Sequence, residues 1–299
     1  VCMGSVSKVY FTKEMTPEKV IKVYDKLGKK LTGNVAIKVH SGEEGNQNYL
    51  KPEFWKPIVE HVGGTIVECN TAYEGERNST EKHVKLIEAH GWNRYFKVDL
   101  MDKTGPDIEI PVRDGKHLSS DIMGKNFLNY DSMLVLSHFK GHPMGGYGGA
   151  LKQLSIGCAS TAGKVNIHSA GKYRKTEEQE IVWDDLPEQD AFLESMAEAA
   201  SAVTDHFAGN IVYINVMANM SVDCDCCAVA EDPCLKDIGI LASTDPVAID
   251  RACIDLVKKS GDVGVEHFME RVTSRNGEHT IEAAAARGIG VEEYELIEV

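Results

Sequence analysis

The sequence predicts an α/β protein built on a mostly parallel or mixed sheet with helices on both faces. Short apolar runs rich in Val and Ile alternate along the chain with amphipathic helical patterns, and polar loops follow the apolar runs. Such alternation implies right-handed crossovers between parallel strands. We expect residues 1–299 to form a single domain, with the charged, turn-rich stretch 172–190 as its candidate boundary or insertion point.

In the first half of the chain, local signals mark where elements begin. Thr16 is a suitable N-cap and Pro17 suits the first helical position, after which Val20, Val23 and Tyr24 fall on one helical face. The other elements follow from apolar runs of strand length or from helical periodicity. We expect strands at 7–12, 34–40, 65–69, 96–100, 108–112 and 132–137, and helices at 17–31, 52–62 and 79–90.

The second half continues the same alternation. A glycine-rich loop ends where a helix should start at Ala150, and an Ala-rich helix should run from Pro187 to Phe207. Asp245 and Pro246 supply an N-cap and a first-turn proline for another helix. We expect two short helices near the end of the chain, and strands at 211–217, 237–243 and 294–299.

Four polar loops follow strands in this scheme and are candidates for a binding site. In open α/β sheets, ligands bind beyond the carboxyl ends of the strands, where loops meet helix N-termini. We therefore expect these loops to converge on one site: 41–48, 70–78, 138–149 and 218–236.

Composition excludes several classes of partner. The formal net charge is −14, with 46 acidic and 32 basic residues, which argues against non-specific binding to nucleic acid or to an anionic membrane surface. No apolar run approaches the roughly 18–20 residues that span a bilayer. The first residues lack the charged and apolar regions of a secretory signal, so we expect a cytoplasmic protein. In a reducing cytosol, clustered cysteines suggest metal or redox chemistry rather than disulfides.

Four of the eight cysteines lie in one short segment, and we predict that they bind a metal: Cys224, Cys226, Cys227 and Cys234. Four thiolates satisfy an iron–sulfur cluster or a structural zinc ion. Because the side chains of adjacent cysteines diverge, an alternative is that three bind one centre with His, Asp or another cysteine as fourth ligand. The acidic residues around these thiols make a bound cation electrostatically favourable. A set of inert buried thiols is the remaining interpretation.

The segment 137–157 combines glycines, histidines and lysines after a strand. Such a loop can bring backbone N–H groups against an anion at a helix N-terminus, with lysines adding positive charge. The alternative is a flexible turn that needs several positive φ angles. We predict as catalytic residues His138, Lys140, His142 and Lys152. We predict as ligand-binding residues Gly145, Gly146, Gly148 and Gly149, together with Asn48, Tyr73, Arg77 and His168.

Standard catalytic motifs are missing from the sequence. There is no G-x-S-x-G elbow, no H-E-x-x-H helix and no Walker A lysine. Hydrolase, zincin and kinase functions therefore have no support.

Several segments together resemble the DUF362 family, whose members are described as uncharacterised iron–sulfur centre proteins. They are "GEEGNQNYLKPEF", "NTAYEGERN", "SHFKGHPMGGYGGALKQLSIGCAS", "KVNIHSAGK" and "VDCDCCAVAEDPCLKDIGILASTDPVAIDRACIDLV". The resemblance covers about residues 7–258 and implies an α/β protein of an anaerobic or facultative organism with a redox or metal-centre role. Many relatives carry a ferredoxin-like insert before the helix that begins near Asp190, and this chain lacks it. Any cluster must therefore use the 224–234 cysteines, with Cys158 as a further candidate.

Three functions remain open from the sequence. The first is a redox-type metal-centre protein, iron–sulfur or otherwise, whose glycine–histidine loop binds a small anionic ligand or lies near a redox partner protein. The second is a non-redox enzyme in which zinc keeps an open position that activates water. The third is a non-enzymatic protein that holds, stores or delivers a metal.

Overall fold

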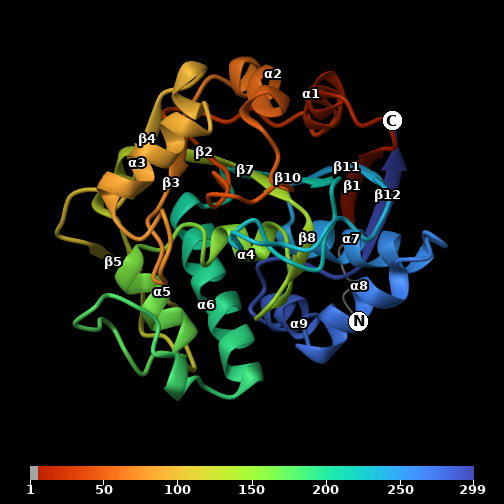
Figure 1. Ribbon diagram of the computed structural model, residues 1–299. Coiled ribbons are helices and arrows are strands. Elements are labelled where there is room, and N and C mark those ends of the chain that lie inside the picture. Colours follow the sequence, from red (N-terminus) through yellow and green to blue (C-terminus); the bar gives the residue numbers. More distant parts are fainter. Residues whose placement is uncertain (1–5) are drawn as a thin grey trace.

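The computed structural model describes residues 6–299, and an eight-stranded sheet forms its centre (Figure 1). The order of its strands is β12-β1-β11-β10-β7-β2-β3-β4. Their bounds are β1 (Ser7–Thr12), β2 (Val35–Lys38), β3 (Thr65–Glu68), β4 (Val98–Leu100), β7 (Ser132–His138), β10 (Ile211–Met217), β11 (Gly239–Ser243) and β12 (Tyr294–Glu298). Residues 1–5, which belong to the expected domain, lie outside the described residues.

The sheet is mostly parallel. β11 runs antiparallel to both of its neighbours, β1 and β10, while the remaining pairs are parallel. The strands other than β11 therefore share one direction, and β2, β3, β7 and β10 end at the same edge. The predicted α/β class with a mostly parallel or mixed sheet is confirmed.

Helices cover both faces of the sheet. In Figure 1 one group lies above the sheet: α1 (Pro17–Lys26), α2 (Pro52–Val62) and α3 (Thr80–Ala89). The other group lies below it: α4 (Ala150–Leu154), α5 (Thr161–His168), α6 (Gln189–Phe207), α7 (Pro246–Lys259), α8 (Val265–Ser274) and α9 (His279–Ala286). Short 3-10 helices are η1 (Trp92–Arg94), η2 (Lys125–Asn129) and η3 (Trp183–Asp185).

Each face of the sheet has its own hydrophobic core because alternate strand residues point to opposite sides. In β7, Met133 and Val135 pack in the core that includes α4, α6 and α7, whereas Leu134 and Leu136 pack in the core of α1 and α2. All residues of β7 and β10 are buried. This double burial explains why the central strands read as continuous apolar runs in the sequence.

Some elements differ from the sequence-based expectation. The first helix ends at Lys26 rather than near residue 31, because Gly28 follows in a left-handed conformation (φ 61°) that breaks the helix. The expected strand at 108–112 is β5 (Ile108–Pro111), which pairs with β6 (Ser120–Met123) outside the main sheet.

The glycine-rich loop contains structure that its sequence did not predict. It folds into a hairpin of β8 (Lys140–His142) and β9 (Gly146–Gly148), followed directly by α4. Glycine has low intrinsic strand propensity, so tertiary contacts hold this hairpin together. At Gly141 the backbone of the hairpin lies so close to Val222 that an added Cβ would be 2.3 Å from the carbonyl oxygen of that residue.

The described helices include none that is both long and apolar enough to span a bilayer.

Candidate functional site

The loops that follow β2, β3, β7 and β10 contact one another at the shared edge of the sheet. The backbone N–H of Glu43 donates to the carbonyl of Asp225 (2.8 Å), and the side-chain amide of Asn46 donates to the carbonyl of Cys227 (2.8 Å). Because β2 and β10 lie on either side of β7, these bonds connect loops across three neighbouring strands.

A cavity of about 490 Å³ opens between these loops. Its lining combines cationic, imidazole and thiol groups with an apolar wall. The charged and polar groups are Lys38, His40, Glu68, Cys69, Thr71, Tyr73, Glu74, Arg77, His142, Lys152, Gln153, Lys164, His168, Cys226 and Cys227. The remaining lining residues are Ala72, Pro143, Met144, Ile156, Gly157, Ile181 and Trp183.

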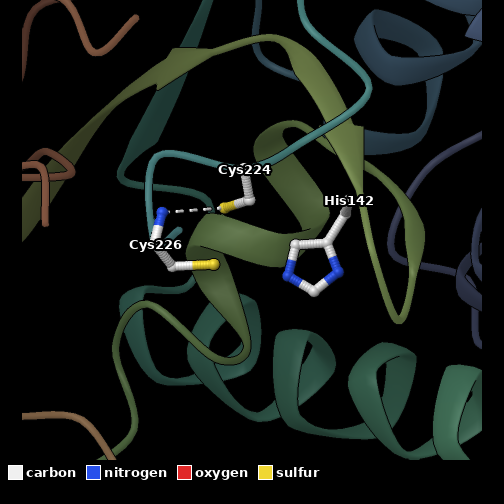
Figure 2. A group of neighbouring side chains, drawn as sticks. All are labelled: His142, Cys224 and Cys226. Carbon is white, nitrogen blue, oxygen red and sulfur yellow. Dashed lines mark hydrogen bonds between the residues drawn. The ribbon is translucent and has the colours of Figure 1, made fainter. Parts of the chain in front are cut away.

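Two cysteine sulfurs and one imidazole lie close together at this site, and side chains of both kinds can bind metal ions. Ligand atoms of His142, Cys224 and Cys226 all lie within 4.8 Å of one another. Figure 2 shows a ring nitrogen of His142 turned toward the two sulfurs, which come from a different loop. The backbone N–H of Cys226 also points at the sulfur of Cys224 (3.5 Å). The sequence places His142 far from these cysteines, and the sheet order brings them together.

The tautomer of His142 follows from its backbone contacts. Its Nδ1 accepts the N–H groups of Met144 (3.1 Å) and Gly145 (2.8 Å), so in the neutral ring the proton sits on Nε2. His40 is held in the same way, since its Nδ1 accepts the N–H of Gly42 (3.1 Å). Both rings therefore present an N–H donor on the side away from their own loop.

These donors surround Cys224. Burial would raise the pKa of its thiol, but a hydrogen bond from the Cys226 thiol and the positive charges of Lys152 and Lys140 hold that pKa well below its usual value. The Nζ of Lys152 donates to the sulfur at 3.4 Å. His142 adds a further hydrogen bond. Cys224 is therefore favoured as a thiolate.

The two rings that face Cys224 are neutral. Burial lowers the pKa of His40 to about 4, with the Arg77 charge acting in the same direction. Burial also lowers the pKa of His142, and Lys152 adds to the effect. Neutral donors beside a thiolate stabilise its charge without neutralising it.

Most of the cavity's cations have an anionic partner. Lys38 forms a buried ion pair with Glu68 (2.6 Å), and Arg77 pairs with Glu43 (3.1 Å). Lys152 faces the sulfur of Cys224. Lys38 and Glu68 are not among the predicted site residues, although each ends a buried strand at the edge where ligands bind in such sheets.

Lys164 is the exception among these cations. Its Nζ donates to the carbonyl of Ala159 (2.6 Å), and it forms no ion pair with a carboxylate of residues 6–299. Burial lowers its pKa, while the nearby Cys69 and Asp102 act in the opposite direction. Lys164 thus leaves positive charge at the cavity without a direct anionic contact.

Two of the predicted catalytic residues lie behind the cavity rather than in it. His138 donates from Nδ1 to Asp225 (2.9 Å), and Lys140 pairs with the same carboxylate (3.1 Å). Burial would raise the pKa of Asp225, but His138 and Lys140 lower it. These buried ion pairs connect the end of β7 to the loop 218–236, which carries the clustered cysteines. The other two predicted catalytic residues, His142 and Lys152, line the cavity.

The predicted ligand-binding residues also separate into two sets. Tyr73, Arg77 and His168 line the cavity. Asn48 instead donates to the carbonyl of Glu231 (2.8 Å) and so joins two loops. The glycines do not line the cavity and form the hairpin and the start of α4: Gly145, Gly146, Gly148 and Gly149.

The four cysteines predicted as metal ligands do not all lie at the cavity. Cys227 lines the cavity beside Cys226, and a hydrogen bond with Cys226 lowers the pKa of Cys227. Cys234 lies elsewhere: its thiol donates to the carbonyl of Met220 (3.6 Å) and packs against the hydrophobic core. Cys158 is buried, does not line the cavity, and contacts the sulfur of Met133. The cysteines of residues 6–299 are all free thiols.

Comparison with known proteins identifies a family for this sequence. The family described as "Domain of unknown function (DUF362)" matches residues 35–255. Among the curated proteins, none matches the chain.

Solved structures resemble the fold at low sequence identity. One is the lactate racemase apoprotein from Thermoanaerobacterium thermosaccharolyticum, with a TM-score of 0.45, 11% identity, and coverage of 98% of this chain and 83% of that one. Another is a Thermotoga maritima protein solved as a structural genomics target, with a TM-score of 0.43, 12% identity, and coverage of 90% of this chain and 58% of that one.

Proposed function

This chain belongs to the DUF362 family, and we propose that it is a metal-centre protein in which Cys224 and Cys226 hold a metal ion or cluster at the wall of the cavity. A small anionic ligand binds beside that centre. The observation that carries the proposal is the approach of the Cys224 and Cys226 sulfurs to within 4.8 Å of each other at the wall of the cavity.

The donor chemistry suits a soft or borderline metal. Thiolates favour zinc, copper(I) and iron in clusters over magnesium or calcium. A ligand thiol must lose its proton before it binds a metal, and Lys152 and His142 favour the thiolate at Cys224. Cys227, at the same wall of the cavity, is the natural third sulfur.

His142 has a supporting role in this proposal. Its Nδ1 accepts two backbone N–H groups, so its Nε2 carries the proton and offers no lone pair to a metal. Its Nε2–H instead donates to the Cys224 sulfur, as does the ammonium group of Lys152. Hydrogen bonds to ligating sulfurs tune the affinity and the reduction potential of a metal centre.

The cavity supports binding of a ligand next to the centre. Structural metal sites are closed by protein ligands on all sides, whereas reactive sites keep one side open. Here the sulfurs of Cys226 and Cys227 adjoin a cavity of about 490 Å³ with four cationic side chains in its lining. An open side next to cations favours a small anionic ligand.

Metal analysis tests the proposal. Wild-type protein, Cys224→Ser, Cys226→Ser and the control Cys234→Ser are purified anaerobically, and metal and acid-labile sulfide per chain are measured with a visible spectrum. We expect metal in the wild type and in Cys234→Ser, and a loss of most of it in the other two variants. Iron with sulfide would favour the redox function, and zinc the non-redox one.

Two outcomes contradict the proposal. One is metal-free wild-type protein that also fails to bind iron or zinc on reconstitution. The other is unchanged metal content in both Cys224→Ser and Cys226→Ser. Metal loss in Cys234→Ser alone would move the centre away from the cavity and would equally reject this assignment.

A further inference from the structure

We propose that the anionic ligand of the cavity is a monocarboxylate carrying a flat apolar group, with its carboxylate at Lys164 and its apolar group against Trp183. This inference rests on the anionic-ligand half of the proposed function and names the class of ligand. It follows from the charges of the cavity, from its apolar wall and from the way its rim is held.

The charges of the cavity favour a single negative charge on the ligand. Lys38 and Arg77 are each paired with a carboxylate, and Lys152 faces the Cys224 sulfur. Among residues 6–299, the ammonium group of Lys164 donates only to the backbone carbonyl of Ala159. One carboxylate would therefore satisfy the cation that lacks an anionic partner, whereas a dianion would add a buried charge without one.

Two buried carboxyl groups near Lys164 are not in direct contact with its ammonium group. Asp102 is held by the backbone N–H groups of Asn70 and Thr161 (3.0 and 3.2 Å), and burial raises its pKa. Burial raises the pKa of Asp121 well above its usual value, which favours its neutral form. Neither carboxyl group forms an ion pair with Lys164 among the described residues.

The histidine beside Lys164 adds no charge. His168 donates from Nδ1 to the carbonyl of Lys164 (2.7 Å), and burial lowers its pKa to about 3. The ring is therefore neutral above pH 5. The excess positive charge in this part of the cavity stays on the lysine.

One wall of the cavity is apolar and ends in an exposed tryptophan. Ala72, Ile156 and Ile181 are buried in this wall, while Trp183 is 49% exposed at the rim. A large aromatic ring at the mouth of a cavity is a common place for a ligand's apolar group, because contact removes apolar surface of both partners from water. The wall therefore favours a flat apolar body over a small hydrated anion.

The segment that carries this wall is anchored. The N–H of Ile181 donates to the carbonyl of Ala72 (2.8 Å), which ties the segment to the loop after β3. The hydroxyl of Tyr173 donates to Asp185 (2.5 Å), which closes the segment around η3. Trp183 is thus presented to the cavity from a fixed rim, so less ordering entropy opposes ligand contact.

Calorimetric titration with three probes tests the inference on the protein as purified anaerobically with its metal. Phenylacetate has both features, acetate has only the carboxylate, and 2-phenylethanol has only the apolar group. We expect phenylacetate to bind more tightly than either of the others. Trp183→Ala should weaken phenylacetate about three- to tenfold and leave acetate unchanged. The exposed neighbour Leu186→Ala is the control.

A second variant tests the other end of the ligand. Lys164→Met should weaken both carboxylates about tenfold or more and leave 2-phenylethanol unchanged. The exposed Lys175→Met is its control. Because Lys164 is buried, melting temperature is measured for each variant, and Trp183→Ala keeps the test decisive if Lys164→Met does not fold.

The inference is overturned if phenylacetate binds no more tightly than acetate, or if Trp183→Ala leaves its affinity unchanged. Metal content is measured on the same samples to separate the two proposals. Absence of metal together with the expected probe pattern would reject the metal centre alone. Full metal content without phenylacetate binding would reject the ligand class alone.

Discussion

At the scale of single residues, the site is dominated by buried polar groups that satisfy one another. The ammonium group of Lys38 is fully buried and donates to Glu68, which also accepts from the backbone and hydroxyl of Ser41. The Lys38 charge helps to lower the pKa of Glu68, against the opposing effect of burial. A buried charge with its partner present is tolerated, whereas the same charge alone is strongly destabilising.

His83 gives a prediction at this scale. Its ring is buried between Asn70 and Ser41, and burial lowers its pKa to about 3. In the unfolded chain the pKa is near 6.5, so between about pH 3 and pH 6.5 the unfolded state binds the proton and the folded state does not. The contribution of the neutral His83 ring to the free energy of unfolding is fully present above pH 6.5 and is lost as the pH falls toward 3. The loss reaches about 2 kcal/mol at pH 5.

The variant His83→Gln removes this titrating group. We expect it to be less stable than the wild type at pH 7.5, because the hydrogen bonds to Asn70 and Ser41 change. Between pH 7.5 and pH 5, however, its free energy of unfolding should fall by about 2 kcal/mol less than that of the wild type. Urea unfolding at several pH values measures the difference, with the exposed His267→Gln as control. Parallel loss of stability in His83→Gln and the wild type would contradict the assignment.

At the scale of elements, the short helix α4 depends on a side chain from another helix. Asp250 of α7 accepts the N–H groups of Ala150 (2.8 Å) and Leu151 (3.0 Å), and Asn215 of β10 donates to it as well (2.8 Å). A five-residue helix is too short to be stable alone. The carboxylate caps α4 from outside and so fixes the start of the helix that carries Lys152.

Asp250→Asn tests this cap. The amide keeps the size of the side chain but turns an N–H donor toward a backbone donor, and the buried mismatch should cost about 1–3 kcal/mol of unfolding free energy. Urea unfolding compares this variant with the exposed Asp184→Asn as control. A stability equal to that of the control would show that α4 does not need the carboxylate.

At the scale of the whole molecule, the sheet is most stable at its centre and least at its edges. β7 and β10 are buried over their full lengths and pair with a strand on each side. β12 is an edge strand with partly exposed residues. Backbone amides with buried hydrogen bonds exchange only through large openings, whereas edge amides exchange through local fraying.

Hydrogen exchange measured by mass spectrometry checks this order. We expect the peptides of β7 and β10 to be the slowest to exchange, and those of β12 to exchange early. Protection in β12 equal to that in β10 would show that the edge is covered by contacts absent from this structure.

Much of the fold could be predicted because the signals are local. The apolar runs of β2, β3, β7 and β10, the first-turn prolines of α1 and α7 and the Asp245 cap of α7 are readable within a few residues of sequence. The motifs of the family are also continuous stretches of chain. The sequence therefore determined the α/β class, the family and the loops that surround the cavity.

Tertiary structure decided which residues of those loops meet. The order of β2, β7 and β10 in the sheet brings His142 to Cys224 and Cys226, and the same order leaves Cys234 packed against the core. The hairpin that holds His142 and the Asp250 cap on α4 depend on contacts between distant segments. Spacing along the chain does not encode such contacts, because they form only after the sheet has set the distances between its loops.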